Sequence, residues 1–84
     1  MRVDLHPTGP CWINVVVDGQ NVFSGIMQGG ERRTLTVREA AVIDVGDAGA
    51  FAFSVDGRRG RPLGMPGQVK TARLTRQTVS QYVR

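Results

Sequence analysis

The sequence has few of the residues on which disulfide-stapled domains and metal sites depend. Its 84 residues include one cysteine, one histidine and one lysine. Cys11 therefore has no partner for an internal disulfide. A zinc site needs more ligands than Cys11 and His6 can supply, so we expect neither a metal nor a cofactor. Cys11 is instead expected to be a small, buried, apolar side chain.

Long apolar segments are lacking as well. The longest runs, at residues 15–17 and 48–53, fall far short of the roughly 20 residues that span a bilayer. No apolar stretch follows Met1, so no signal peptide is recognisable. We expect that this chain does not cross a membrane and that a segment outside it directs any export.

The composition excludes a disordered chain and allows one domain. Hydrophobic residues make up 40% of the sequence and charged residues 21%, which is too apolar for intrinsic disorder. The length is near the lower limit at which one core can stabilise a domain without staples. The net charge of +4 and the pI near 10.6 come almost wholly from arginine, and they are compatible with an anionic partner.

Two-residue periodicity and glycine-rich bends indicate antiparallel strands. Residues 11–17 are β-branched and aromatic and stop at Asp18-Gly19, a strong signal for a tight hairpin turn into residues 20–27. Asp56-Gly57 repeats this turn chemistry and predicts a second hairpin. Further strands are expected at residues 33–38, 41–45, 51–55 and 68–75, with a short edge strand near Leu63.

The last third of the chain leaves two structural questions open. Val69 and Leu74 cannot both face inward on a regular pleat, so this strand needs a β-bulge or a partly polar inner face. Residues 76–84 form either one helical turn or a frayed end. The expected fold is all-β, a small antiparallel β-sandwich of about seven short strands with hairpin connections. The expected units are a lead-in segment at 1–10, a β domain at 11–75 and a tail at 76–84.

Arginines in loops are the best candidates for a binding surface. Arg58, Arg59 and Arg61 lie together on the second hairpin, and we expect Arg32 and Arg33 to join them from another loop. Guanidinium groups bind phosphate and carboxylate at two points, so this surface would suit an anionic lipid, wall polymer or protein. The alternative is that these arginines only keep a small apolar domain soluble.

No catalytic constellation is recognisable, and we do not expect an enzyme. His6 and Cys11 would need a positioned third group and a pocket to act as base and nucleophile. Residues 64–71 look at first like a phosphate-binding loop, but Val69 stands where that loop requires glycine. The glycines of this segment are therefore interpreted as turn formers.

Several short segments resemble the RodZ C-terminal domain family in their order and spacing, from Cys11 to about Leu74. The most specific are Cys11-Trp12, the Gly-Asp-Ala-Gly-Ala turn at 46–50 and the Pro-Leu-Gly-x-x-Gly segment at 62–67. The sequence departs from the family pattern at Leu35, where an aromatic residue is common, and at Asp47 and Asp56, where asparagine is common. The other matching segments are Ile13-Asn14-Val15, Val17-Asp18-Gly19, Val22-Phe23-Ser24-Gly25 and Gly30-Glu31.

The resemblance implies a β-sandwich-like domain on the outer, periplasmic side of the bacterial inner membrane. In the full protein, such a domain is joined to a transmembrane helix and to a cytoplasmic helix-turn-helix domain that contacts the actin-like protein MreB. The resemblance implies no catalytic residues, and it implies protein partners in the machinery of cell shape and wall synthesis. Our first hypothesis is therefore a non-catalytic scaffold domain of a cell-shape regulator.

Two alternative functions stay open. A nucleic-acid-binding β domain would fit the high pI, but lysine is scarce, and Phe51 and Phe53 are expected to pack in the core rather than to stack on bases. A domain that binds a wall glycan would need an exposed aromatic side chain beside acids or amides. Trp12 is the only candidate for that platform, and we expect it to be buried as a strand anchor.

Overall fold

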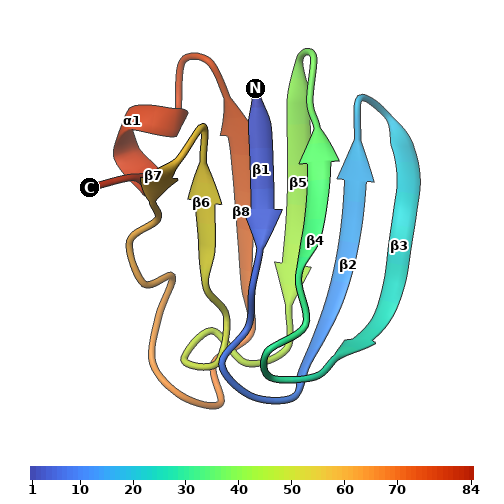
Figure 1. The fold of residues 1–84 in the computed structure, drawn as a ribbon, viewed down its shortest axis with the longest axis vertical. Coiled ribbons are helices and arrows are strands. Elements are labelled where there is room, and N and C mark those ends of the chain that lie inside the picture. Colours follow the sequence, from blue (N-terminus) through green and yellow to red (C-terminus); the bar gives the residue numbers. More distant parts are fainter.

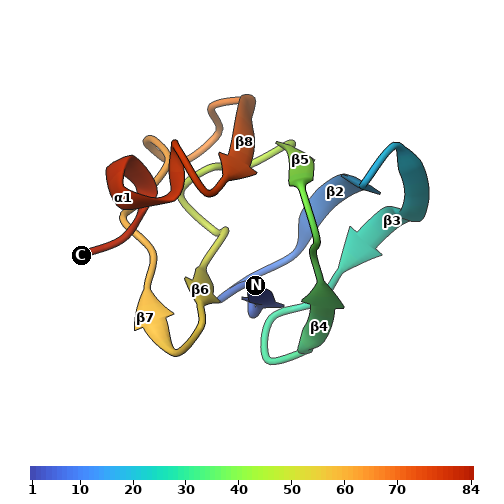
Figure 2. The same ribbon diagram turned by 90° about the horizontal axis from the view of Figure 1, so that it is seen from above.

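Two antiparallel four-stranded sheets stack on one another in the computed structural model, which describes all 84 residues (Figures 1 and 2). One sheet has the strand order β4-β1-β6-β7 and the other β3-β2-β5-β8. The all-β sandwich expected from the sequence is confirmed. The strands are β1 (Arg2–Leu5), β2 (Cys11–Val17), β3 (Gln20–Met27), β4 (Arg33–Thr36), β5 (Ala40–Val45), β6 (Phe53–Val55), β7 (Arg58–Arg59) and β8 (Lys70–Thr75).

Both predicted hairpins are confirmed. Asp18 and Gly19 join β2 to β3 with φ angles of 50° and 83°, and Asp56 and Gly57 join β6 to β7 with 50° and 82°. Two successive positive φ angles are typical of the type I′ turn, whose twist matches that of the strands it joins. The register of β2 against β3 shifts once, after Val15, so the first hairpin contains a bulge.

Alternate residues of the strands fill the space between the sheets. Ile13 and Ile43 in one sheet and Leu5 in the other are fully buried. Phe51 and Phe53 also lie in the core, 5% and 2% exposed, and their rings stack with centroids 5.5 Å apart. They therefore pack as expected and form no exposed platform for bases.

The first strand was not predicted from the sequence. We expected residues 1–10 to be only a lead-in segment, but β1 pairs with β4 on one side and with β6 on the other. Val3 and Leu5 are fully buried, so β1 is a central strand of its sheet. Its four residues are too few for a clear period, and both of its partner strands lie far away in the sequence.

The end of the chain packs onto the domain. The helix α1 (Val79–Tyr82) lies beside β7 and β8 at the side of the sandwich away from β3 and β4 (Figure 2). Val83 is 2% exposed and forms a bridge with Gly60, and the Arg84 amide donates to the Arg59 carbonyl at 3.0 Å. Residues 79–84 are thus part of the fold rather than a frayed end. No helix of this structure is long and apolar enough to cross a membrane.

The segment between β6 and β8 differs from the prediction in one respect. The short edge strand that we expected near Leu63 lies instead at Arg58–Arg59, where β7 pairs with β6. The last strand needs neither a bulge nor a polar inner face, because β8 begins only at Lys70. Val69 lies outside the strand and is 72% exposed. Ala72 and Leu74 then face the core on a regular pleat.

Candidate interaction surface

The five arginines predicted as one surface form two separate groups. Arg33 begins β4, whereas Arg58 and Arg59 form β7, and these strands are the two edges of the same sheet. Three strand spacings of about 4.8 Å separate the edges by about 14 Å. The Arg33 guanidinium lies 4.1 Å above the ring of Phe23, in the other sheet. Arg32, next to it, stays with this edge.

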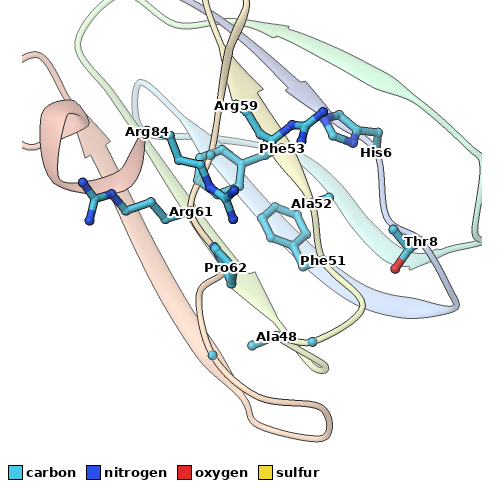
Figure 3. Close-up of a pocket in the computed structure, with 13 residues that line it drawn as sticks. His6, Thr8, Ala48, Phe51, Ala52, Phe53, Arg59, Arg61, Pro62 and Arg84 are labelled. Atoms are coloured by element: carbon cyan, nitrogen blue, oxygen red, sulfur yellow. The ribbon is translucent and has the colours of Figure 1, made fainter.

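Two arginines of the other group, Arg59 and Arg61, border a hollow of about 380 Å³ beside β6 and β7 (Figure 3). Arg59, Arg61 and Arg84 belong to its lining, and the lining contains no aspartate or glutamate. Phe51 and Phe53 lie at its base but are only 5% and 2% exposed. In Figure 3 the side chain of Arg84 runs toward the rings, whereas the Arg61 guanidinium points away from them. The hollow is therefore bordered mainly by positive charge.

Two of the arginines at this edge hold the end of the chain in place. Arg58 donates from Nη2 to the Arg84 carbonyl at 3.1 Å, and Arg61 donates from Nε to the Val83 carbonyl at 3.1 Å. The side chains of Arg59 and Arg84 make no hydrogen bond or ion pair within the domain. The single ion pair of the protein, between Arg2 and Asp4, lies elsewhere in the sheet. Arg59 and Arg84 are thus the two cations at this edge that are free for a ligand.

Gly60 shapes the base of the hollow. A Cβ atom at this position would collide with the tip of the Phe53 ring, and the Gly60 amide donates to the Phe53 carbonyl at 2.8 Å. Only glycine therefore lets the second hairpin lie so close to this ring. His6, on the other side of β6, places Nε2 3.0 Å from Ser54 Oγ. These contacts hold the residues around Arg59 in place.

A second exposed feature lies on the outer face of the other sheet and corrects our expectation for Trp12. Trp12 is 46% exposed rather than buried, because Cys11 and Ile13 on either side face the core. Its partner across the hairpin, Ile26, is 60% exposed. The ring thus stands on an open sheet face, and a Cβ atom added at Gly46 would lie 3.3 Å from the Trp12 Cβ.

Polar side chains continue this face beside Trp12. Asn14, Asp44 and Thr71 stand opposite one another on β2, β5 and β8, and Ser24 pairs with Asn14 on β3. The Thr71 hydroxyl donates to Asp44 Oδ1 at 2.6 Å, and Ser24 and Asn21 both hydrogen-bond to Asn14 Oδ1. An exposed indole beside a row of amide, acid and hydroxyl groups is the surface that a glycan would need.

Two carboxyl groups with lowered pKa values lie away from both surfaces. A hydrogen bond from Thr34, opposed in part by burial and aided by Arg2, lowers the pKa of Asp4. Backbone amides of Ala40, Arg38 and Glu39 donate to the Asp18 carboxylate at 2.7–2.9 Å and lower its pKa. Asp18 thereby ties the first hairpin to the loop before β5, so both carboxylates act in the fold.

The three segments that carry the family resemblance most specifically, Cys11-Trp12, residues 46–50 and residues 62–67, meet at one end of the sandwich. The Asp47 carboxylate accepts from the amides of Gly49 at 3.1 Å and Gly67 at 2.9 Å. The Cys11 thiol lies 3.4 Å from the Asp47 carbonyl oxygen, and a Cβ on Gly49 would collide with the backbone of Pro66. These residues thus fix a loop junction, and their spacing reflects the fold rather than a reactive site.

Arg84 and the Trp12 face were missed by sequence reasoning. The strict alternation of buried positions around Trp12 was the available signal for its exposure, whereas no local signal placed Arg84 beside Arg59.

Among solved structures, none matches this chain. The family model of the RodZ C-terminal domain matches residues 4–75 of the 84 residues. The chain therefore belongs to the RodZ C-terminal domain family.

Proposed function

We propose that this domain is a non-catalytic, extracytoplasmic interaction module that helps to link the MreB cytoskeleton to wall synthesis. The observation that carries the proposal is the family match over residues 4–75. It identifies a RodZ-like cell-shape protein, with protein partners in the cell-shape machinery, and the family is not a known enzyme family. In the full protein, a transmembrane helix and a cytoplasmic helix-turn-helix domain complete the link.

The geometry supports a scaffold that presents one surface to a partner. β7, Gly60 and residues 79–84 hold each other through hydrogen bonds, so the edge of the sandwich is preformed. Arg59 and Arg84 stand on that edge without internal partners. A preformed surface loses little entropy when a partner binds, which favours an interaction role for this edge.

Two measurements on the full-length protein test this proposal. A reporter enzyme that is active only outside the cytoplasm, fused after Arg84, should be active if the domain is extracytoplasmic. A full-length gene from which residues 4–75 are deleted should fail to restore cell shape in a strain that lacks the protein. An inactive reporter, with a cytoplasmic fluorescent reporter active at the same position, would contradict the location. Normal shape with the deletion would contradict the role.

A second candidate, binding of a wall glycan, is favoured by one observation, the exposure of Trp12 beside Asn14 and Asp44. Sugar rings pack their apolar faces on indole, so glycan fragments should change the tryptophan fluorescence of the domain. Trp12→Ala should abolish sedimentation of the domain with purified wall polymer, whereas Val22→Ala on the same hairpin should not. Equal sedimentation of both variants would eliminate this candidate.

A further inference from the structure

The edge strand β3 differs from the other three sheet edges of the domain. It has eight residues, more than any other strand, and it contains no charged residue and no proline. β4 has only four residues and begins with Arg33, and β7 consists of Arg58 and Arg59. β8 carries Lys70 and Arg73. Short length and charge are the usual features that keep a sheet edge from pairing with another chain, and β3 lacks both.

The edge at β3 is also open. No helix or strand lies beyond β3 in Figure 1, where it is the outermost strand of its sheet. The opposite edge of the other sheet, at β7, is covered by the end of the chain, because the Arg84 amide donates to the Arg59 carbonyl. Ser24 and Ile26 on β3 are both exposed. A further strand can therefore approach β3 without displacing any part of the domain.

The hydrogen bonds of the sheet indicate which backbone groups of β3 are unused. The Gly46 amide donates to the Trp12 carbonyl at 2.8 Å, so Trp12 turns its backbone groups toward β5. Successive residues of an antiparallel strand turn in opposite directions, so the next residue of β2 turns toward β3, where its partner is Gly25. Ser24 and Ile26, on either side of Gly25, therefore turn their N–H and C=O groups away from the sheet.

We propose that β3 pairs with β3 of a second copy of this chain, antiparallel about a two-fold axis at Gly25. The register against β2 is regular from Phe23 to Met27, and Gly25 is the centre of this segment. An axis there places Ser24 opposite the partner's Ile26, and Ile26 opposite the partner's Ser24. Each of these two pairs exchanges two hydrogen bonds, so every outward N–H and C=O group of both residues is used. The two four-stranded sheets become one sheet of eight strands.

The absence of charge favours a second copy as the partner. A two-fold axis brings each edge residue close to its own copy, so an edge with arginine or lysine repels itself, and β3 is the edge without either. Phe23 lies opposite the partner's Met27, which pairs apolar with apolar. At the axis, facing Cα atoms approach to about 4.5 Å, and Gly25 adds no side chain to that space.

The contact is small, and this determines the affinity that we expect. Five residues of each copy take part, which places the interface in the class below about 1,200 Å² that is typical of weak, transient complexes. The net charge of +4 on each copy adds a weak repulsion, which salt screens beyond about 8 Å. We therefore expect a dissociation constant between about 10 μM and about 1 mM.

Sedimentation equilibrium of the 84-residue chain between about 20 μM and about 2 mM tests the dimer over this range. The molar mass should rise from 9.1 kDa toward twice that value. Ser24→Pro removes the outward amide at a position where an edge strand tolerates proline, and it should raise the dissociation constant by about tenfold or more. Ser24→Ala is the matched control, because it also loses the hydroxyl contact with Asn14 but keeps the amide. Its dissociation constant should stay within about twofold of that of the unchanged protein.

Hydrogen exchange of the backbone amides, measured by NMR at both ends of the concentration range, identifies the edge that pairs. The amides of Ser24 and Ile26 should exchange more slowly as the concentration rises, because the dimer gives them acceptors. The amides of Thr71 and Arg73 are the control, since they turn outward from β8 at the opposite edge of the same sheet. Their exchange should not depend on concentration.

The inference is overturned if the chain stays monomeric up to about 2 mM. It is also overturned if folded Ser24→Pro dimerises as strongly as Ser24→Ala, or if Thr71 and Arg73 gain protection instead of Ser24 and Ile26. Circular dichroism verifies the fold of both variants, and if Ser24→Pro does not fold, the exchange data on the unchanged protein decide. The proposed function does not depend on the dimer, and deletion of residues 4–75 tests it separately.

Discussion

Replacement of Val83 by alanine tests whether the end of the chain belongs to the folded domain. Val83 is 2% exposed, lies in the core cluster and forms a bridge with Gly60. Loss of two buried methyl groups costs about 0.8 kcal/mol each, and the space left behind adds to this, so the free energy of unfolding should fall by about 2 kcal/mol. In a domain of this size, Tm should then fall by about 10 °C.

Urea unfolding followed by circular dichroism measures this effect. Val69→Ala is the matched control, because Val69 is 72% exposed and outside every strand, and its substitution should change the free energy of unfolding by less than about 0.5 kcal/mol. If Val83→Ala were as stable as Val69→Ala, residues 79–84 would not be packed onto the core. The wall of the hollow that Arg84 provides would then be absent.

Three further predictions follow from the structure. Gly60→Ala should destabilise the domain by about 1–3 kcal/mol, because its Cβ collides with the Phe53 ring, whereas Gly9→Ala has room; equal stability of the two would contradict the packing. Since folding lowers the pKa of Asp18, its stabilising effect is complete above the unfolded pKa of about 3.9 and disappears as the pH falls through the folded pKa. Asp18→Asn should therefore flatten the acid branch of the stability curve, and an unchanged curve would refute this role. Trp12 fluorescence should be red-shifted and readily quenched by acrylamide, and a blue-shifted, protected signal would show that the ring is buried.

The parts of the fold that depend on local sequence were predictable. The hairpin at Asp18-Gly19 and its repeat at Asp56-Gly57 need only the residues of the turn and the alternation beside it. β1 was not predictable in this way, because its two partners are separated from it by about 30 and 50 residues of sequence. A strand of four residues gains its stability from such pairing rather than from its own pattern.

The candidate site was predictable only in part. Arg58, Arg59 and Arg61 were recognised as a cluster because they are neighbours in the sequence. Their separation from Arg33 depends on the order of strands in the sheet, which hairpin signals do not determine. The expectation that Trp12 is buried was wrong. It followed from the size of the side chain, whereas the two-residue period of the strand decides which face the side chain takes.

The most direct test of a partner surface at β7 is the cell shape supported by full-length protein that carries Arg59→Gln and Arg84→Gln. Protein with Arg73→Gln and Arg76→Gln, expressed at the same level, is the control. We predict that the first variant fails to restore normal cell shape while the control restores it. Normal shape with the first variant, at normal protein abundance, would contradict an interaction role for this edge of the sandwich.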